Sequence, residues 1–215
     1  MLLLAFDTAS PTVTVALHDG SAVVARQDRE GAMRHGELLA PAIAAVLAAA
    51  GVDRQQLTDV AVGVGPGPYT GLRVGIVTAR TLAVALPVRV HGVCSLDVVA
   101  AAARARIEGP LVVATDARRK EVYWARYDDA GHRVSGPAVD RPAELAERLP
   151  AGLPVVGRGA QLYSDLLHAV DGPVDPDAGV LADVVVRDAV PTLAPEPLYL
   201  RRPDVRVPGA PKRVS

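Results

Sequence analysis

The sequence predicts an α/β protein built from two similar halves, because one pattern of strand, aspartate and turn occurs twice. Residues 2–6 form an apolar run of strand length that ends at Asp7, and residues 111–115 form a similar run that ends at Asp116. In both halves a β-branched strand resumes six residues after the aspartate, and a turn with aspartate and glycine follows. Chance is the alternative explanation, since strand, acidic residue and turn are a common combination.

The first half is expected to open with an antiparallel sheet of three strands. Short apolar runs and alternating β-branched residues mark these strands, which cover residues 2–6, 12–17 and 22–27. Asp19 and Gly20 separate the second strand from the third, and this pair favours a tight hairpin turn. The first half therefore begins as a meander.

Two helices with apolar surfaces are expected next. Apolar residues recur at helical spacing over residues 35–50, and alanines fill the opposite face, so we expect this helix to be buried on two sides. A second helix is expected over residues 72–86, where Gly75, Ala79 and Ala83 form a stripe that allows close packing. The other elements of this half are expected at residues 60–64 and 88–93, as strands, and 95–106, as a helix.

The second half is expected to start after Gly109 and Pro110, which mark a break between domains. Beyond the repeated strands, a strand is expected over residues 154–156 and helices over residues 142–149, 161–169 and 178–188. The last stretch is rich in proline and increasingly polar, so we expect it to lie on the surface or to have no fixed structure. The predicted organisation is an N-terminal domain at residues 1–108, a C-terminal domain at 109–190 and an extension at 191–215.

The composition indicates a globular, cytoplasmic protein. Hydrophobic residues make up 50% of the chain and charged residues 22%, a balance that argues against disorder. The formal charge of −1 supplies no general attraction for phosphate backbones, so we expect the chain alone to bind nucleic acid poorly. The one cysteine, Cys94, suits a reducing compartment, and no apolar stretch has the length of a membrane span.

Two short segments are candidates for binding a nucleotide. Asp7 ends a strand, and the polar turn that follows it includes Ser10, so the pair offers a carboxylate for a metal ion and a hydroxyl for a phosphate. Gly65 and Gly67 precede Tyr69 at a strand-to-helix junction, where free N–H groups and the helix dipole favour an anion. The alternatives are an Asx turn at the aspartate and a tight turn shaped by glycine and proline.

Catalytic and metal-binding residues are not expected in this chain. Its five histidines never fall three or four residues apart, which is the spacing of helical metal ligands. No nucleophile-elbow pattern surrounds Ser95, and Cys94 is expected to be a small core residue.

Four segments together carry a family resemblance, at residues 34–39, 65–75, 116–123 and 196–201, which read RHGELL, GPGPYTGLRVG, DARRKEVY and EPLYLR. With these segments the chain resembles the bacterial TsaB family, also called YeaZ. The resemblance implies an actin-like, sugar-kinase-like (ASKHA) fold of two duplicated subdomains, each with a mixed sheet and flanking helices.

The resemblance also implies a role in making threonylcarbamoyladenosine beside the tRNA anticodon. It implies a non-catalytic subunit that binds and activates a TsaD-type transferase, works with a TsaE-type ATPase, forms homodimers when alone and meets tRNA only through the complex. It implies no cofactor of its own, with ATP or ADP at the subunit interface left open. The catalytic paralogue has paired metal-binding histidines where this chain has only His91, so we expect no transferase chemistry here.

The two apolar helices give a physical reason for a partner, because they carry more apolar surface than one small sheet should cover. We therefore predict that they form the partner interface. The residues expected nearest the partner are Met33, His35, Leu38, Leu39, Ile43, Gly75 and Ala79. The alternative is that these faces are all internal.

Three other functions stay open on the sequence alone. The chain could be a stand-alone ATPase or kinase of the same fold, a peptidase, or a dimeric scaffold without a link to tRNA. The basic residues of the last fifteen positions also leave open a tail contact with tRNA, against the alternative of a solvated tail.

Overall fold

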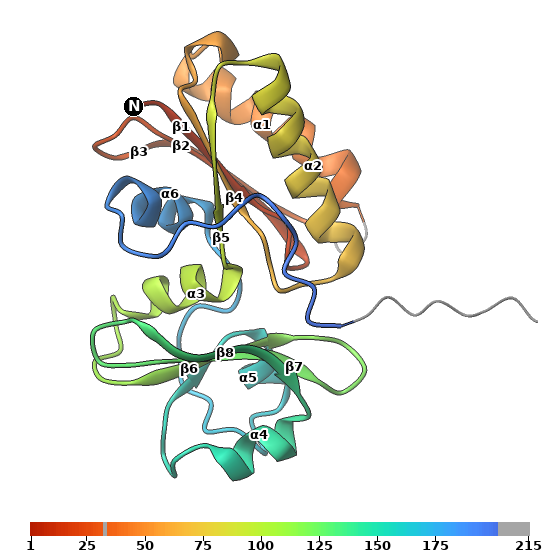
Figure 1. Ribbon diagram of the computed structural model, residues 1–215, viewed down its shortest axis with the longest axis vertical. Helices are drawn as coiled ribbons and strands as arrows, with labels where there is room; N and C mark the ends of the chain where they lie inside the picture. Colours follow the sequence, from red (N-terminus) through yellow and green to blue (C-terminus); the bar gives the residue numbers. More distant parts are fainter. Residues whose placement is uncertain (32–33, 202–215) are drawn as a thin grey trace, which may run out of the picture.

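The computed structural model describes residues 1–31 and 34–201. These residues form two lobes stacked along the long axis of the molecule, each with its own sheet (Figure 1). No helix in this part of the chain is both long and apolar enough to cross a membrane.

The first sheet has five strands in the order β3-β2-β1-β4-β5. Strands β1 to β3 form the predicted antiparallel meander, and β4 and β5 are added parallel to β1. The sheet is mixed because a helix returns the chain before β4 and again before β5. The bounds are Leu3–Asp7 for β1, Thr12–His18 for β2, Val23–Glu30 for β3, Asp59–Gly63 for β4 and Arg89–Val93 for β5.

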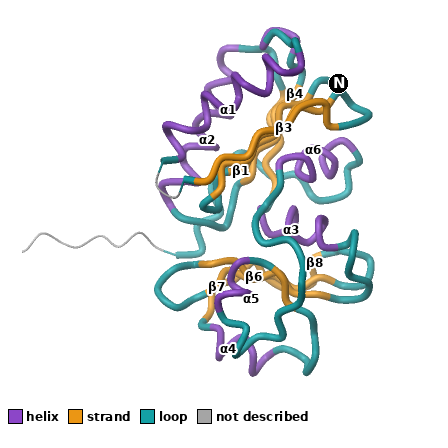
Figure 2. The backbone as a smooth tube through the Cα atoms, turned by 180° about the vertical axis from the view of Figure 1, so that it is seen from behind, coloured by secondary structure: helices purple, strands orange, loops and turns teal. Residues whose placement is uncertain are grey.

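Helices cover both faces of this sheet (Figure 2). Leu39 and Ile76 bring α1 and α2 onto one face, where they pack against Phe6. Leu181 brings α6 onto the other face, against Leu3. The bounds are His35–Ala50 for α1, Tyr69–Ala85 for α2, Ala178–Val186 for α6, and Arg54–Gln56 for the short 3-10 helix η1.

The second sheet repeats the plan of the first. Its order is β8-β7-β6-β9, again an antiparallel meander with a parallel strand beside its first member. Helix α3 packs on the face that looks toward the first lobe, and α4 and α5 pack on the other face. The bounds are Ser95–Ala103 for α3, Leu111–Asp116 for β6, Val122–Tyr127 for β7, Arg133–Asp140 for β8, Pro142–Arg148 for α4, Val155–Val156 for β9 and Arg158–Leu162 for α5.

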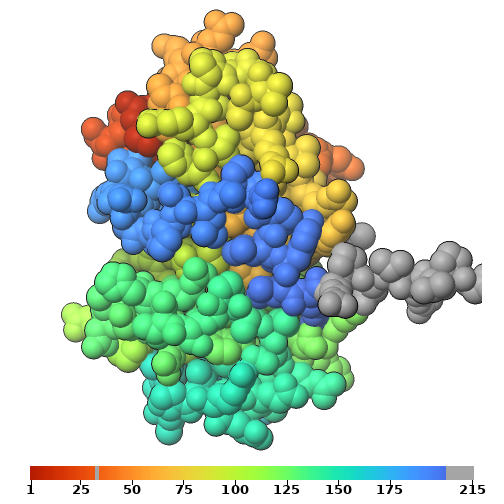
Figure 3. All heavy atoms as spheres, in the orientation of Figure 1, coloured from red at the N-terminus to blue at the C-terminus, as the bar shows by residue number. Residues whose placement is uncertain are grey.

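The packing crosses the predicted domain boundaries. Helix α6 falls in the range 109–190, yet it completes the first lobe, and α3 falls in 1–108, yet it packs mainly with the second sheet. Part of the range 191–215 is also built into the fold, because Leu193 pairs with Gly92 and the N–H of Leu198 donates to Val64 O at 2.9 Å. In Figure 3 this segment, in blue, runs across the molecule where the lobes meet.

Two helix predictions need correction. Helix α1 is buried on one side only, because Leu39 and Val46 enter the core while Ala40 and Ala44 are exposed. The helix expected over residues 161–169 is instead the short α5, which ends at Leu162 and is followed by turns.

Candidate functional site

The two strand-end aspartates have the same local geometry where the lobes meet. Asp7 ends β1 and its Oδ1 accepts a hydrogen bond from the N–H of Ala9 at 2.6 Å. Asp116 ends β6 and its Oδ1 accepts from the N–H of Arg118 at 2.8 Å. Both are Asx turns, and the repeat seen in the sequence extends to hydrogen bonding. Nucleotide binding by Asp7 and Ser10 stays a prediction.

Asp7 is held inside the fold by its neighbours. Its Oδ2 accepts a hydrogen bond from Ser95 Oγ at 2.6 Å, and Ser95 Oγ in turn accepts from the N–H of Gly65 at 3.2 Å. A side chain at Gly63 would overlap the carboxylate, which explains glycine there. Burial raises the pKa of Asp7 above its ordinary value, although the hydrogen bonds from Ser95 and Ala9 oppose this shift.

The raised pKa of Asp7 predicts how stability depends on pH. The folded chain holds the Asp7 proton more tightly than the unfolded chain does. The free energy of unfolding therefore falls as pH rises from 3.8, the ordinary pKa of this carboxyl, through its higher pKa in the folded chain. Asp7→Asn removes this pH-dependent decrease in the free energy of unfolding, because the amide does not ionise. We therefore expect the variant to be at least as stable as the original chain at pH 7. Urea denaturation of both proteins from pH 3.5 to 7 measures the difference. A difference that stays constant over this range would contradict the buried, proton-retaining carboxyl.

The gap between the turn that follows Asp7 and the turn at Asp116 is almost filled. It is lined by Ser10, Asp116 and Arg118, and its cavity of about 20 Å³ has room for about one water molecule. Arg158 and Asp175 also line it, and Arg158 Nε donates to Asp175 Oδ1 at 3.0 Å. Small-molecule sites typically enclose roughly 300–1,000 Å³, so this cavity is too small for a nucleotide by itself. A second cavity of about 360 Å³ adjoins it and shares Ser10 and Arg118.

The glycine-rich loop crosses the β1–β2 turn at close range. Gly65 has a φ of +95°, and a Cβ on Gly67 would collide with the backbone of Ala9. The tight-turn alternative is therefore confirmed for this loop. Nucleotide binding by these glycines stays a prediction. Tyr69 begins α2 directly after the loop, and its exposed ring stacks on that of Tyr199.

The small residues of α2 face the β1–β2 turn of their own lobe. Thr8 Oγ1 donates to Gly71 O at 2.8 Å and accepts from the N–H of Gly75 at 3.2 Å. A side chain at Gly75 would occupy the position of that hydroxyl. One turn further on, Ala79 is fully buried in the first core. The small residues of α2 thus allow close packing within this chain.

Most residues expected at the partner interface are buried in the first lobe. His35 Nε2 lies 2.8 Å from Ser10 O, Leu39 and Ile43 enter the core, and Leu38 packs at its edge. Gly75 and Ala79 are buried as described above, and Met33 lies outside the described residues. The exposed sides of the two helices instead carry Gly36, Ala40, Ala44 and Ala48 from α1, and Val77 and Val84 from α2.

The histidines take part in contacts within the fold. His91 Nε2 lies 2.9 Å from Asp59 Oδ1, and His18 Nε2 lies 3.2 Å from Asp183 Oδ1. Among residues 1–31 and 34–201, no group of three or more His, Cys, Asp or Glu side chains could hold a metal ion.

Comparisons with known proteins place this geometry in context. The family model described as TsaD, tRNA N6-adenosine threonylcarbamoyltransferase, matches residues 24–171. A Mycobacterium tuberculosis protein described as uncharacterized is 42% identical over 207 residues, which are 95% of this chain and 93% of the relative. The Escherichia coli tRNA threonylcarbamoyladenosine biosynthesis protein TsaB is 34% identical over 177 residues, 77% of this chain and 75% of that protein.

A solved structure supports the fold independently. It is a Pseudomonas aeruginosa protein described as similar to peptidase YEAZ, with 28% identity and a TM-score of 0.79. The match covers 93% of this chain and 99% of that structure. Together with the two repeated mixed sheets, it confirms the actin-like α/β fold that the sequence resemblance implies.

Proposed function

This chain belongs to the TsaB (YeaZ) family, and from that premise we propose that it binds and activates a TsaD-type transferase in the synthesis of tRNA threonylcarbamoyladenosine. The observation that carries the proposal is the relationship to E. coli TsaB over three quarters of that protein. In the proposed complex the TsaD-type protein performs threonylcarbamoyl transfer, and this chain contributes no catalytic group.

The contacts of potential catalytic side chains support an accessory role. Asp7 is enclosed by Ser95 and the Ala9 N–H, and His91 is paired with the buried Asp59. Burial raises the pKa of the Cys94 thiol to about 12, so it is not a thiolate nucleophile at neutral pH. The burial of Cys94 and the raised pKa of its thiol speak against a cysteine peptidase.

The outer side of α1 and α2 is the partner surface in this proposal. The two helices pack side by side on the first sheet (Figure 1), and α2 presents Val77 and Val84, which are 57% and 90% exposed. Val77 and Val84 are seven residues apart and therefore lie on the same side of α2, as the apolar contacts of a helix that meets another protein do. When the partner is absent, the same surface pairs two copies of this chain. A TsaE-type ATPase and ATP or ADP at the interface complete the proposed assembly.

Reconstitution tests the proposed function. We expect tRNA, threonylcarbamoyl-adenylate and TsaD-type and TsaE-type proteins of one organism to give about 100-fold more modified nucleoside with this chain than without it. The chain on its own should modify nothing. Nucleoside mass spectrometry measures both outcomes. Equal modification without the chain would overturn the activating role, and modification by the chain alone would overturn its non-catalytic character.

A further inference from the structure

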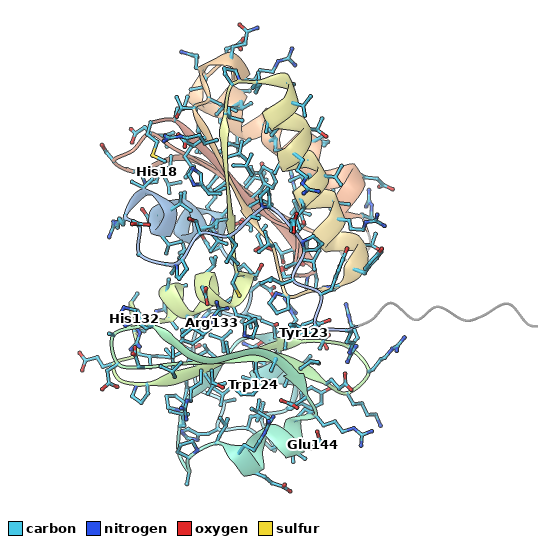
Figure 4. The ribbon with its side chains drawn as sticks, in the orientation of Figure 1. His18, Tyr123, Trp124, His132, Arg133 and Glu144 are labelled. Carbon is cyan, nitrogen blue, oxygen red and sulfur yellow. The ribbon has the colours of Figure 1, made fainter. Side chains whose placement is uncertain are left out.

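Another cavity lies on the same junction, beside the gap between the two aspartate turns. It has a volume of about 340 Å³ and opens to solvent between the start of α2, the β6–β7 turn and the segment at residues 199–201. Its walls include Tyr69, Tyr123 and Tyr199, together with Arg118, Arg119 and Arg201. We call it the tyrosine–arginine pocket. Figure 4 shows Tyr123 at this junction, near the end of the described chain.

The pocket gathers aromatic rings from distant parts of the chain. Three of the five tyrosines line it, although the chain is only 3% aromatic. The rings of Tyr69 and Tyr199 stack with centroids 5.0 Å apart and an interplanar angle of 22°. They are 45% and 42% exposed, so this stacked pair offers ring surface to a ligand, as aromatic platforms for unpaired bases do.

Positive charge surrounds the aromatic platform. The Arg73 guanidinium lies 5.0 Å from the centroid of the Tyr69 ring, and Arg118 and Arg119 line the cavity beside it. Among the described residues, Asp116 is bridged to Arg118 and Glu121 is bridged to Arg201. The pocket thus brings several arginines to one place in a protein whose overall formal charge is −1.

The turn that supplies these arginines has an unusual backbone. Arg118, Arg119 and Lys120 have φ angles of +60°, +55° and +61°, a left-handed conformation that is unfavourable for residues with a Cβ. Arg201 Nη1 donates to Ala117 O at 2.8 Å, which ties the C-terminal segment to this turn. Three successive cationic residues are therefore held in a costly conformation, and the first two of them, Arg118 and Arg119, line the pocket.

The geometry suits an RNA strand better than a free nucleotide. The pocket is open, and the charged residues that line it are Arg118 and Arg119 from the β6–β7 turn and Arg201 from the C-terminal segment. In the nearby glycine loop the N–H of Gly65 is bonded to Ser95 and Gly67 lies against Ala9, so the Gly65 N–H is already engaged within the fold. Stacking surface next to a row of cations is the arrangement by which proteins bind single-stranded nucleic acid.

We propose that the tyrosine–arginine pocket is an RNA-binding site, in which an unpaired base stacks on Tyr69 and Tyr199 while the arginines contact the adjoining phosphates. The assignment of this RNA as the tRNA substrate rests on the proposed function. The pocket gives the activating subunit its own contact with the nucleic acid, in addition to its contact with the transferase.

The test measures tRNA binding in two arms, with the chain alone at low salt and with the chain assembled with its TsaD-type partner. In each arm the double variant Tyr69→Ala/Arg118→Ala should weaken tRNA binding by about tenfold or more. The slope of log K against log salt should become shallower by about one unit, because one phosphate contact is lost. Tyr69→Phe keeps the stacking ring and loses only the hydroxyl that accepts from Arg73, so it should weaken tRNA binding much less than Tyr69→Ala.

The matched control is Tyr163→Ala/Arg187→Ala, which removes the same residue types far from the pocket and should leave tRNA affinity unchanged. Thermal melts establish that every variant is folded, and crosslinking of 4-thiouridine tRNA should label peptides that contain residues 69, 118 or 199. Unchanged affinity in both arms, or crosslinks confined to other regions, would overturn the proposal. Loss of ATP or ADP binding with unchanged tRNA binding would assign the pocket to a free nucleotide instead.

The two arms separate this inference from the proposed function. If the chain proves dispensable for modification, the activating role fails, while the arm with the chain alone still decides whether the pocket binds RNA. If modification requires the chain but neither arm responds to the double variant, the pocket proposal alone fails.

Discussion

Replacing Val77 and Val84 together with aspartate is expected to abolish pairing with the TsaD-type partner and to lower tRNA modification by at least about 100-fold. Both side chains lie on the outer side of α2 and are among the exposed large hydrophobic residues of the chain. Two carboxylates placed in a packed interface would lose their hydration without gaining a partner. Size-exclusion chromatography of the mixed subunits and nucleoside mass spectrometry measure the two effects.

The isolated double variant should remain folded, because neither valine contributes to the first core. Val134→Asp is the matched control, since it places the same charge at an exposed valine of β8 in the second lobe. It should leave pairing and modification unchanged. Normal pairing by Val77→Asp/Val84→Asp would show that the partner binds elsewhere on the chain.

The fold could be predicted from the sequence where local pattern and tertiary packing agree. The strands that open each half are marked by apolar runs and β-branched residues, and the structure places them in two corresponding sheets. Strand β8 was not predicted, because Gly136 and Pro137 interrupt it and normally indicate a loop. It is an edge strand with a register shift opposite Trp124 and Arg126, so the missing N–H of proline is tolerated there.

The direction in which a helix faces could not be predicted from its periodicity. The apolar positions of α1 identify one buried stripe correctly, but the pattern is the same whether the stripe meets its own sheet or another protein. The structure turns Leu39 and Ile43 toward the sheet, so the exposed alanines are left for a partner. The position of α6 on the first lobe could not be predicted from the sequence either, because the chain returns to this lobe only after it has formed the second sheet.

In the candidate site, too, local sequence patterns predict contacts between near neighbours but not contacts between distant segments. The Asx turns at Asp7 and Asp116 depend on contacts between residues two apart, and the sequence included them as an alternative. The tyrosine–arginine pocket instead joins residues near positions 69, 123 and 199, which no local pattern connects. Only the folded chain brings these side chains together.

Replacing Ala79 with arginine is expected to destabilise the chain by about 4 kcal/mol or more, which is enough to unfold many domains of this size. Ala79 is fully buried on the inner side of α2 among hydrophobic residues of the first core, so a longer side chain lacks space and its charge would lose hydration. Urea denaturation followed by circular dichroism measures the loss. The variant should fail to activate the transferase because the first lobe is unfolded.

Thr81→Arg is the control for folding alone, because Thr81 lies between Val77 and Val84 on the outer side of α2. Thr81 is exposed two residues further along the same helix, so arginine there should change the free energy of unfolding by less than about 1 kcal/mol. If Ala79→Arg instead folded normally and lost only its partner, Ala79 would contact that partner directly, as the small-residue stripe suggested. Because α2 turns Ala79 inward and Val77 outward, substitutions at the two positions should fail in different ways, one in folding and the other in assembly.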